Sequence, residues 1–288
     1  MEPLTFTIII LFISVLAGFI GSLVGVGGGI VIVPVLTVVF GIPVGYAIGT
    51  SIVSVIATSS GSASAYVKER ITNIRIGTFL VTATTVGAIA GAVTTIYLIS
   101  SGLSWTVYLS FGLLLLFSAA DFSLQVWKKG RAGEEDVNQI PNFISRKLAL
   151  SGEYYDSALK KNTSYIAERV PEGYGIMFAA GVLSGLLGIG SGALKVLGMD
   201  RMMRLPFKVS TTTSNFMIGV TAVASASIFY LKGYVNLILV APVAVGVLLG
   251  SFIGSKLLIR SRPFSLRVLF ICVLIALGIE MLQKGLVI

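Results

Sequence analysis

Two glycine clusters lie inside apolar segments of the sequence, Gly25-Val-Gly-Gly-Gly29 and Gly188-Ile-Gly-Ser-Gly192. A glycine turn that opens a half-helix directs backbone N–H groups along the helix axis, where the positive potential suits an anion. Close packing of helices through small residues is the alternative, and for any single glycine it is the stronger one. Because the clusters are paired, the pattern favours binding, and the candidate residues are Gly27, Gly28, Gly29, Gly190, Ser191 and Gly192.

Short runs of polar side chains follow Pro43 and Pro206 by about two helical turns. Hydroxyl and amide groups can donate hydrogen bonds to an anion without holding it too tightly for release. Serine and threonine also bond back to their own helix or join neighbouring helices, and that structural role stays open here. The candidates for substrate contact are Thr50, Ser51, Thr212, Thr213, Ser214 and Asn215.

Lys195 follows the second glycine cluster by three positions and has Ile32 as its counterpart in the first half. A lysine inside a membrane is costly unless it faces a cavity or a partner, so Lys195 could supply a fixed positive charge for an anionic substrate. The alternative is that its long side chain reaches back to the membrane surface beside Arg201 and Arg204.

Composition excludes several kinds of chemistry. The chain has no histidine and a single cysteine, Cys272. A Ser-His triad, histidine-based metal or haem ligation and an intramolecular disulfide are therefore ruled out. We expect no catalytic residue, no metal site, no cofactor and no enzymatic activity.

The positions of the carboxylates bear on energy coupling. None lies well inside an expected membrane span, whereas proton relays usually rest on buried Asp, Glu or His. The simpler scheme is a channel-like or uniport mechanism, in which an inside-negative potential expels an anion with about 2.3 kcal/mol per charge per 100 mV. Proton coupling through Asp121, Asp200 or Glu280 stays open.

The elements that position these residues are expected to be membrane helices. Hydrophobic residues make up 55% of the 288 and charged residues 11%, against about 25% charged in soluble domains. Residues 4–67 contain no charged side chain. The net charge of +9 lies mainly between apolar blocks, which disfavours nucleic-acid binding. The sequence therefore predicts an all-α polytopic membrane protein.

Apolar blocks of about one membrane crossing each are separated by charged residues, glycine and proline. They are Leu4–Phe40 and Tyr174–Val196, each with a glycine break, and Val44–Val67, Ile76–Ile99, Leu103–Phe122, Phe207–Tyr230, Val235–Leu257 and Phe264–Leu282. Between them lies a polar insert, residues 123–173. Two mixed segments flanking residues 156–162 suggest a β-hairpin there, and a flexible linker is the alternative.

An internal repeat relates the two ends of the chain. Sliding the sequence along itself aligns Gly18–Gly91 with Gly181–Gly254 without a gap, pairing Pro43 with Pro206, Thr50 with Thr213 and Asn73 with Asn236. Such self-similarity indicates two repeated units. We expect a first transmembrane repeat at residues 1–122 and a second at 174–288.

Positive charges indicate that the two repeats have opposite orientations. Short basic loops stay cytoplasmic, and all lysines and arginines except Lys195, Lys232 and Lys284 then lie inside. The N-terminus is placed outside and the insert in the cytoplasm of a cell-membrane protein. Each repeat becomes a glycine-broken helical hairpin plus three transmembrane helices; the second limb of the hairpin is either a full crossing or a short re-entrant helix. Inverted repeats are typical of secondary transporters with a midplane site.

The motifs resemble those of the sulfite exporter TauE/SafE family. The resemblance rests on Gly185-Leu-Leu-Gly-Ile-Gly-Ser-Gly192 and Leu205-Pro-Phe-Lys-Val-Ser-Thr-Thr-Thr-Ser-Asn215, with echoes at Gly21–Gly29 and Gly41–Ser51. It covers both halves and implies a permease that moves sulfite, sulfoacetate or related organosulfonates outward. Ser191 departs from the usual triple glycine.

We therefore expect an exporter of small sulfur-containing anions with its site between inverted repeats. A transporter of another small organic anion and a membrane scaffold subunit without transport are the alternatives. The expected partners are the small anionic substrate and the lipid bilayer, with no nucleic acid; a homodimer stays open.

Overall fold

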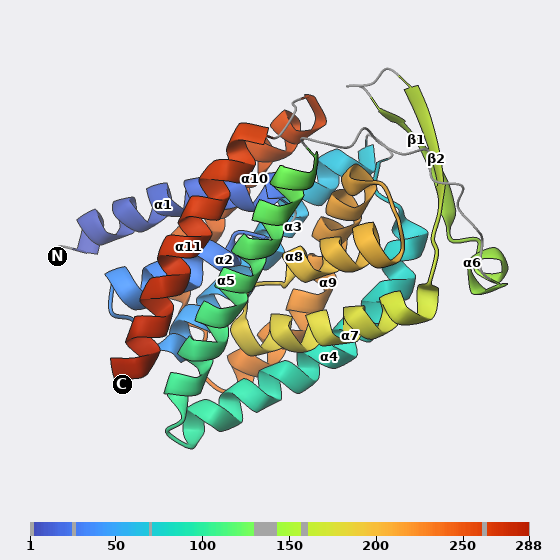
Figure 1. The fold of residues 1–288 in the computed structure, drawn as a ribbon. Helices are drawn as coiled ribbons and strands as arrows, with labels where there is room; N and C mark the ends of the chain where they lie inside the picture. The colour runs from blue at the N-terminus through green and yellow to red at the C-terminus, as the bar shows by residue number, and fades with distance from the viewer. Residues whose placement is uncertain are drawn as a thin grey trace.

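The computed structural model of the chain describes residues 3–24, 27–68, 71–129, 143–156, 161–260 and 264–287. Within these residues, six helices are long and apolar enough to cross a membrane. They are α1 Pro3–Val24, α3 Val44–Lys68, α4 Ile74–Ser100, α7 Val170–Leu187, α9 Phe207–Leu231 and α10 Leu237–Arg260 (Figure 1). Two more long helices, α5 Ser104–Lys129 and α11 Phe264–Val287, lie beside one another. The all-α polytopic membrane fold is confirmed.

Two short broken helices follow α1 and α7. Helix α2 (Gly29–Pro34) continues into the π-helical turn η1 (Val35–Val39), and α8 (Gly192–Leu197) continues into η2 (Gly198–Met202). At 1.5 Å per residue each limb extends roughly 16 Å, about half of a 30 Å hydrocarbon core. The second limb of each glycine-broken hairpin is therefore a short helix and not a full crossing. Gly25 and Val26 of the first cluster lie outside the described residues.

The order of elements recurs along the chain. Helices α2 and α3 begin at Gly29 and Val44, and α8 and α9 begin at the positions that the internal repeat pairs with them, Gly192 and Phe207. The packing partners correspond as well: α1 lies along α10 and α7 lies along α4, while α3 contacts α9. The long first helix of each half thus packs against the other half, and the two halves interlock.

Small residues let these helices approach closely. A Cβ atom on Gly181 or Gly185 of α7 would overlap the backbone of Thr84 or Ala88 in α4. On the other side, Gly250 of α10 is equally close to the backbone of α1. Lipid gives no hydrophobic drive for helices to associate, so this tight van der Waals contact is what holds them together.

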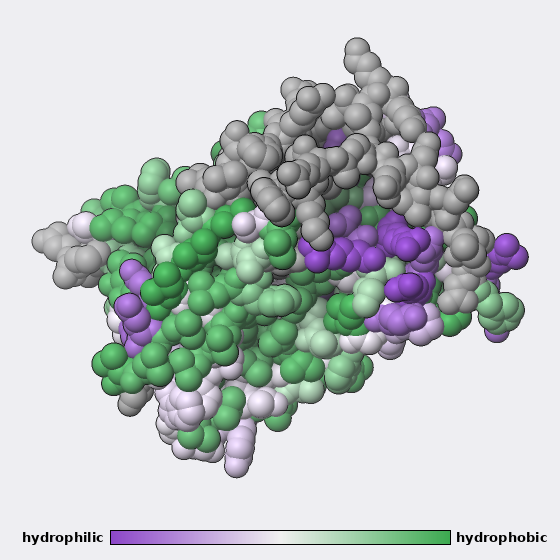
Figure 2. Space-filling view, in the orientation of Figure 1, coloured by the Kyte–Doolittle hydropathy of each residue, from purple (hydrophilic) through white to green (hydrophobic). Residues whose placement is uncertain are grey.

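The insert forms α6 (Phe143–Lys147) and an antiparallel hairpin of β1 (Ser151–Asp156) and β2 (Lys161–Ile166). The hairpin interpretation is confirmed. Helix α5 extends to Lys129 and α7 begins at Val170, so both helices reach into the expected insert 123–173. We call the end of the bundle where the hairpin lies the hairpin end. In Figure 2, hydrophobic side chains cover the flank of the bundle and hydrophilic ones gather toward the hairpin end.

Buried side chains of the hairpin join those of the helices. Tyr154 and Tyr165 belong to one cluster with Leu80 of α4, Met177 of α7 and Met203 after η2. The hairpin is therefore packed onto the helix ends and is part of the same body.

The close contact between α4 and α7 gives a stability prediction. Gly185→Ala is expected to lower the thermal unfolding temperature in detergent, because overpacking a tight contact costs about 1–3 kcal/mol. Gly175→Ala in the same helix is the control, since a Cβ there meets nothing within 4 Å. Size-exclusion chromatography after heating measures the folded fraction, and equal unfolding temperatures for the two variants would contradict the packing described.

Candidate functional site

The two helix breaks meet in the middle of the protein, between α3 and α9. A Cβ atom built on Gly29 would lie 3.0 Å from the carbonyl oxygen of Gly188, and one on Gly27 would lie 3.7 Å from that of Ile189. The hydroxyl of Ser51 donates to the Gly188 carbonyl at 2.7 Å. These contacts run between the two halves of the chain, so each break is covered by protein as an irregular membrane backbone requires.

The backbone at the breaks explains part of the glycine pattern. Gly27 has φ +80° and its counterpart Gly190 has φ +73°, a region that glycine enters at little cost. The next positions differ, since Gly28 has φ −66° while Ser191 has φ +43°. The Ser191 hydroxyl donates to the carbonyl of Ala180. The two breaks are therefore related but not identical in shape.

Lys195 of α8 is fully buried, with 0% of its surface exposed. Its Nζ donates to Thr221 Oγ1 at 3.4 Å, and Thr221 Oγ1 lies 3.0 Å from Thr84 Oγ1. Thr221 stands near the middle of α9 and Thr84 near the middle of α4. Side chains on a helix lean toward its N-terminus, which directs this one back along α8 toward the break. The alternative that Lys195 reaches the membrane surface beside Arg201 and Arg204 is therefore wrong.

The Lys195 ammonium has few hydrogen-bond acceptors around it. Within the described residues no carboxylate lies at ion-pair distance from it, and the Thr221 hydroxyl is its hydrogen-bond acceptor. An ammonium carries three N–H donors, so two are left for another group. A buried cation without a countercharge is unfavourable by several kcal/mol. The arrangement can gain free energy by taking up an anion.

The polar run of α9 bonds to two neighbouring segments and to its own helix. Ser214 donates to the Gly192 carbonyl at 3.3 Å, and Thr213 Oγ1 accepts from the backbone N–H of Asn73 at 3.1 Å. Thr212 donates to the Val209 carbonyl of its own helix at 3.2 Å, the usual arrangement for a helical threonine. The structure therefore joins Ser214 to the break and leaves Thr212 bonded within α9.

Asn215 was expected to donate hydrogen bonds to an anion, but its amide donors already have acceptors in the protein. Its Nδ2 donates to the carbonyl oxygens of Thr211 at 3.2 Å and Ser22 at 3.5 Å. Both amide protons are thus directed at carbonyl groups, and the unpartnered atom is the acceptor Oδ1. In this arrangement Asn215 can accept a hydrogen bond but has no donor free for an anion.

Thr50 is buried and its hydroxyl has no hydrogen-bond partner. Thr211 Oγ1 is in the same condition. Unpaired buried hydroxyls are uncommon, and each costs the free energy of a lost hydrogen bond. They mark places where this closed structure leaves polar groups for a ligand, for water or for another conformation.

The candidate residues are closed off from solvent. Thr50, Ser51, Lys195 and the run from Thr211 to Asn215 are all at most 1% exposed. An ion can therefore reach Lys195 only if the helices move. The structure brings Gly27, Gly29, Ser51, Gly192 and Ser214 together at the breaks, with Lys195 one turn farther along α8.

Thr84 and Thr221 were not among the residues singled out from the sequence. Thr221 aligns with Thr58 in the internal repeat, and such a matched hydroxyl was a signal that could have found it. Thr84 has Val247 as its counterpart, and the sequence carries no comparable signal for it.

Comparisons with known proteins identify the family of this chain. A model of the sulfite exporter TauE/SafE family matches residues 10–281. A Bacillus subtilis (strain 168) protein named "Probable membrane transporter protein YunE" is 29% identical over 286 residues, which cover 96% of this chain and 98% of the relative. "Probable membrane transporter protein YdhB" from the same organism is 28% identical over 248 residues, 86% and 89% of the two chains. No solved structure gives a significant match.

The unpaired charge of Lys195 gives a prediction about stability without ligand. Lys195→Met is expected to raise the thermal unfolding temperature, because replacing buried ionic groups by apolar side chains of similar size often stabilises by about 1–4 kcal/mol. Lys232→Met is the control, since Lys232 is exposed at the end of α9 and its loss should change little. A lower unfolding temperature for Lys195→Met would mean that the ammonium is well compensated in the folded protein.

Proposed function

The chain belongs to the sulfite exporter TauE/SafE family, and from this premise we propose that it exports small sulfur-containing anions such as sulfite, sulfoacetate or other organosulfonates. It is a multi-pass membrane protein and a membrane transporter, as its family and relatives indicate. The class of anion and the outward direction are the proposal.

The observation that carries this proposal is the buried ammonium of Lys195. It faces hydroxyl groups at the middle of two helices and has no carboxylate beside it within the described residues. A cation in this setting attracts one negative charge strongly, because the surroundings screen little. A sulfonate or hydrogen sulfite ion brings one such charge and several oxygen acceptors for the two remaining N–H donors.

The binding set that we propose surrounds the junction of the breaks. It consists of the glycine turns, the hydroxyls on α3 and α9, and Lys195, namely Gly27, Gly28, Gly29, Thr50, Ser51, Gly190, Ser191, Gly192, Lys195, Thr212, Thr213, Ser214 and Asn215. We add Thr221, which accepts a hydrogen bond from the Lys195 ammonium, and Thr84, whose hydroxyl lies beside that of Thr221. Substrate binding would require rotation of some hydroxyls away from their present carbonyl acceptors. The Asn215 amide would likewise have to give up one of its two carbonyl acceptors.

The orientation of the two halves is part of the proposal. We infer that the repeats cross the membrane in opposite directions, with the N-terminus outside and the hairpin end in the cytoplasm. The distribution of lysine and arginine supports this orientation, and so does the recurrence of elements at the positions paired by the internal repeat. A site at the contact of inverted repeats lies near the midplane.

The driving force that we propose is the membrane potential. Among the described residues with placed side chains, the buried carboxylate is Glu168, which pairs with Arg204 at 3.3 Å before α7 begins. Glu280 of α11 is exposed. A site with one positive charge, and with no carboxylate at ion-pair distance from it in the described part of the chain, suits uniport of an anion. For such uniport an inside-negative potential supplies about 2.3 kcal/mol per charge per 100 mV.

Transport in proteoliposomes tests the proposal. Protein reconstituted with internal radiolabelled sulfite or sulfoacetate should release label when a potassium-diffusion potential, negative inside, is imposed. Lys195→Ala is expected to reduce the initial rate at least tenfold, because the site then has no charge to offset that of the anion. Lys195→Arg keeps the charge and should retain part of the flux.

Lys232→Ala serves as the matched control, because it removes an exposed lysine of the second half and should leave the rate unchanged. Flux of the wild-type protein that needs a pH gradient would contradict uniport. Full flux in Lys195→Ala would remove the residue from the site, and an absence of flux with every sulfur anion would overturn the substrate class.

A further inference from the structure

Asn73 connects the start of α4 to the polar run of α9. Its backbone N–H donates to Thr213 Oγ1 at 3.1 Å, and its side-chain Oδ1 accepts from the N–H of Ile76 at 3.0 Å. The second bond caps α4, which fixes the residue's position relative to the helix. The contact therefore holds the loop before α4 against α9 at the hairpin end.

The hairpin holds Asn73 in this place. Asn73 Nδ2 donates to the Ser151 carbonyl and to the Tyr165 hydroxyl, both at 3.1 Å. Burial raises the pKa of the Tyr165 phenol, so the hydroxyl stays neutral at physiological pH. The carbonyl oxygen of Asn73 accepts from the N–H of Gly77 at 2.9 Å. All the hydrogen-bonding groups of Asn73 are thereby engaged by α4, α9 and the hairpin.

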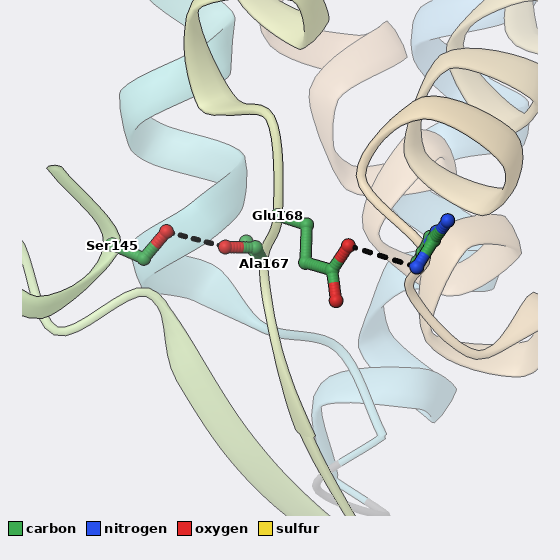
Figure 3. Close-up of polar contacts among 4 residues, drawn as sticks. Ser145, Ala167 and Glu168 are labelled. Atoms are coloured by element: carbon green, nitrogen blue, oxygen red, sulfur yellow. Dashed lines mark hydrogen bonds and ion pairs between the residues drawn. The ribbon is translucent and has the colours of Figure 1, made fainter. Parts of the chain in front are cut away.

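A second attachment joins the residues that follow β2 to the loop before α9. Glu168 follows β2, and its carboxylate points toward the loop between η2 and α9, where it pairs with Arg204 at 3.3 Å (Figure 3). The backbone N–H of Glu168 donates to the Met203 carbonyl at 3.0 Å. Ser145 of α6 donates to the carbonyl of Ala167. The hairpin thus links the loop before α4 to the loop before α9.

The internal repeat supplies a counterpart for this contact at the opposite end of the bundle. It pairs Asn73 with Asn236 and Thr213 with Thr50. Asn236 also uses its Oδ1 at the start of a helix, accepting from the N–H of Ile238 at 2.9 Å. The loop before α10 lies against α3, since a Cβ on Gly49 would overlap the carbonyl group of Tyr234.

The two counterparts differ in the hydrogen bond between loop and helix. Thr213 Oγ1 accepts the Asn73 N–H, whereas the hydroxyl of Thr50 is 0% exposed and has no partner. The same arrangement of loop and helix therefore has its hydrogen bond made at the hairpin end and missing at the other. The asymmetry leaves the buried Thr50 hydroxyl without the partner that its counterpart Thr213 has.

We propose that Asn73–Thr213 and Asn236–Thr50 are two alternating latches, one at each end of the protein. In this structure the hairpin-end latch is made and the opposite latch is open. Transport exchanges them: the loop before α4 (residues 71–73) leaves Thr213 as the loop before α10 (residues 232–236) reaches Thr50. An open latch lets the helices at that end move apart, and this movement admits the ion to the site, which is closed in the present structure. Asn73 and Asn236 act as positioning residues. This inference rests on the proposed transport between inverted repeats.

Labelling of a thiol reporter tests the latches without any substrate. Thr211→Cys in a Cys272→Ala background places a thiol one helical turn from the start of α9, at a buried position whose hydroxyl has no partner. A membrane-impermeant methanethiosulfonate is applied separately to right-side-out and inside-out vesicles. The thiol should react slowly, and from the side of the hairpin end.

Two substitutions should change this rate in opposite directions. Thr213→Val removes the acceptor of the closed latch, and labelling should become about fivefold faster, the change that one net hydrogen bond produces in an equilibrium. Thr50→Val removes the acceptor needed only in the other state, and labelling should become about fivefold slower. Thr58→Val is the control, since that buried hydroxyl donates within α3 to the Ser54 carbonyl at 2.9 Å.

Conservative variants guard against a folding defect. Thr213→Ser keeps the acceptor and should label as slowly as the reporter alone, while Tyr165→Phe removes one hairpin contact of Asn73 and should speed labelling. Rates that change in the same direction for Thr213→Val and Thr50→Val, or that do not change, would overturn the latches. Because the readout is the accessibility of a thiol and not the flux of an anion, a wrong substrate class would leave its result unaffected.

Discussion

A membrane offers no water to a broken helix, and this constraint organises the molecule. Each break frees backbone carbonyl and amide groups that must be satisfied by protein. The chain meets this need by bringing both breaks to the contact of α3 and α9. There Ser51 of the first half donates to the Gly188 carbonyl, and Asn215 of the second half donates to the Ser22 carbonyl. Close glycine contacts of α1 with α10 and of α4 with α7 hold the broken segments there. The polar centre exists because the two halves cover each other's breaks.

We propose that Lys195 makes this junction a binding site. The burial of an ammonium whose acceptor is a threonine hydroxyl 3.4 Å away is unfavourable in free energy. Helix packing alone gives no reason to keep such a group. The surrounding helices exclude solvent, so the charge stays strong and binding must be accompanied by movement. The proposed preference for a small monoanion rests on one positive charge among hydroxyls and glycine backbone. Because solvent is excluded from Lys195, the proposed hydrogen bonds Asn73–Thr213 and Asn236–Thr50 would control which end of the protein admits the ion.

Much of the fold could be predicted from the sequence because apolar blocks and charged loops report local properties. The helices begin and end within a few residues of the blocks, and the hairpin lies where mixed segments flank residues 156–162. The length of the second limb could not be predicted, since Gly29–Phe40 is apolar whether it crosses fully or not. The partners of the site residues could not be predicted either. The Lys195–Thr221–Thr84 contacts and the donors of Asn215 depend on which face of α9 meets α4, α8 or α1, and one sequence does not encode these long-range contacts in a readable pattern.

The central claim is that the Lys195 ammonium binds the anion. Isothermal titration calorimetry of the detergent-purified protein with sulfite at constant pH tests it most directly, because binding is measured apart from transport. We expect saturable binding of about one sulfite per chain to the wild-type protein and no measurable binding to Lys195→Met, with both proteins folded. Equal affinity of the two proteins for sulfite would show that the anion does not bind at Lys195.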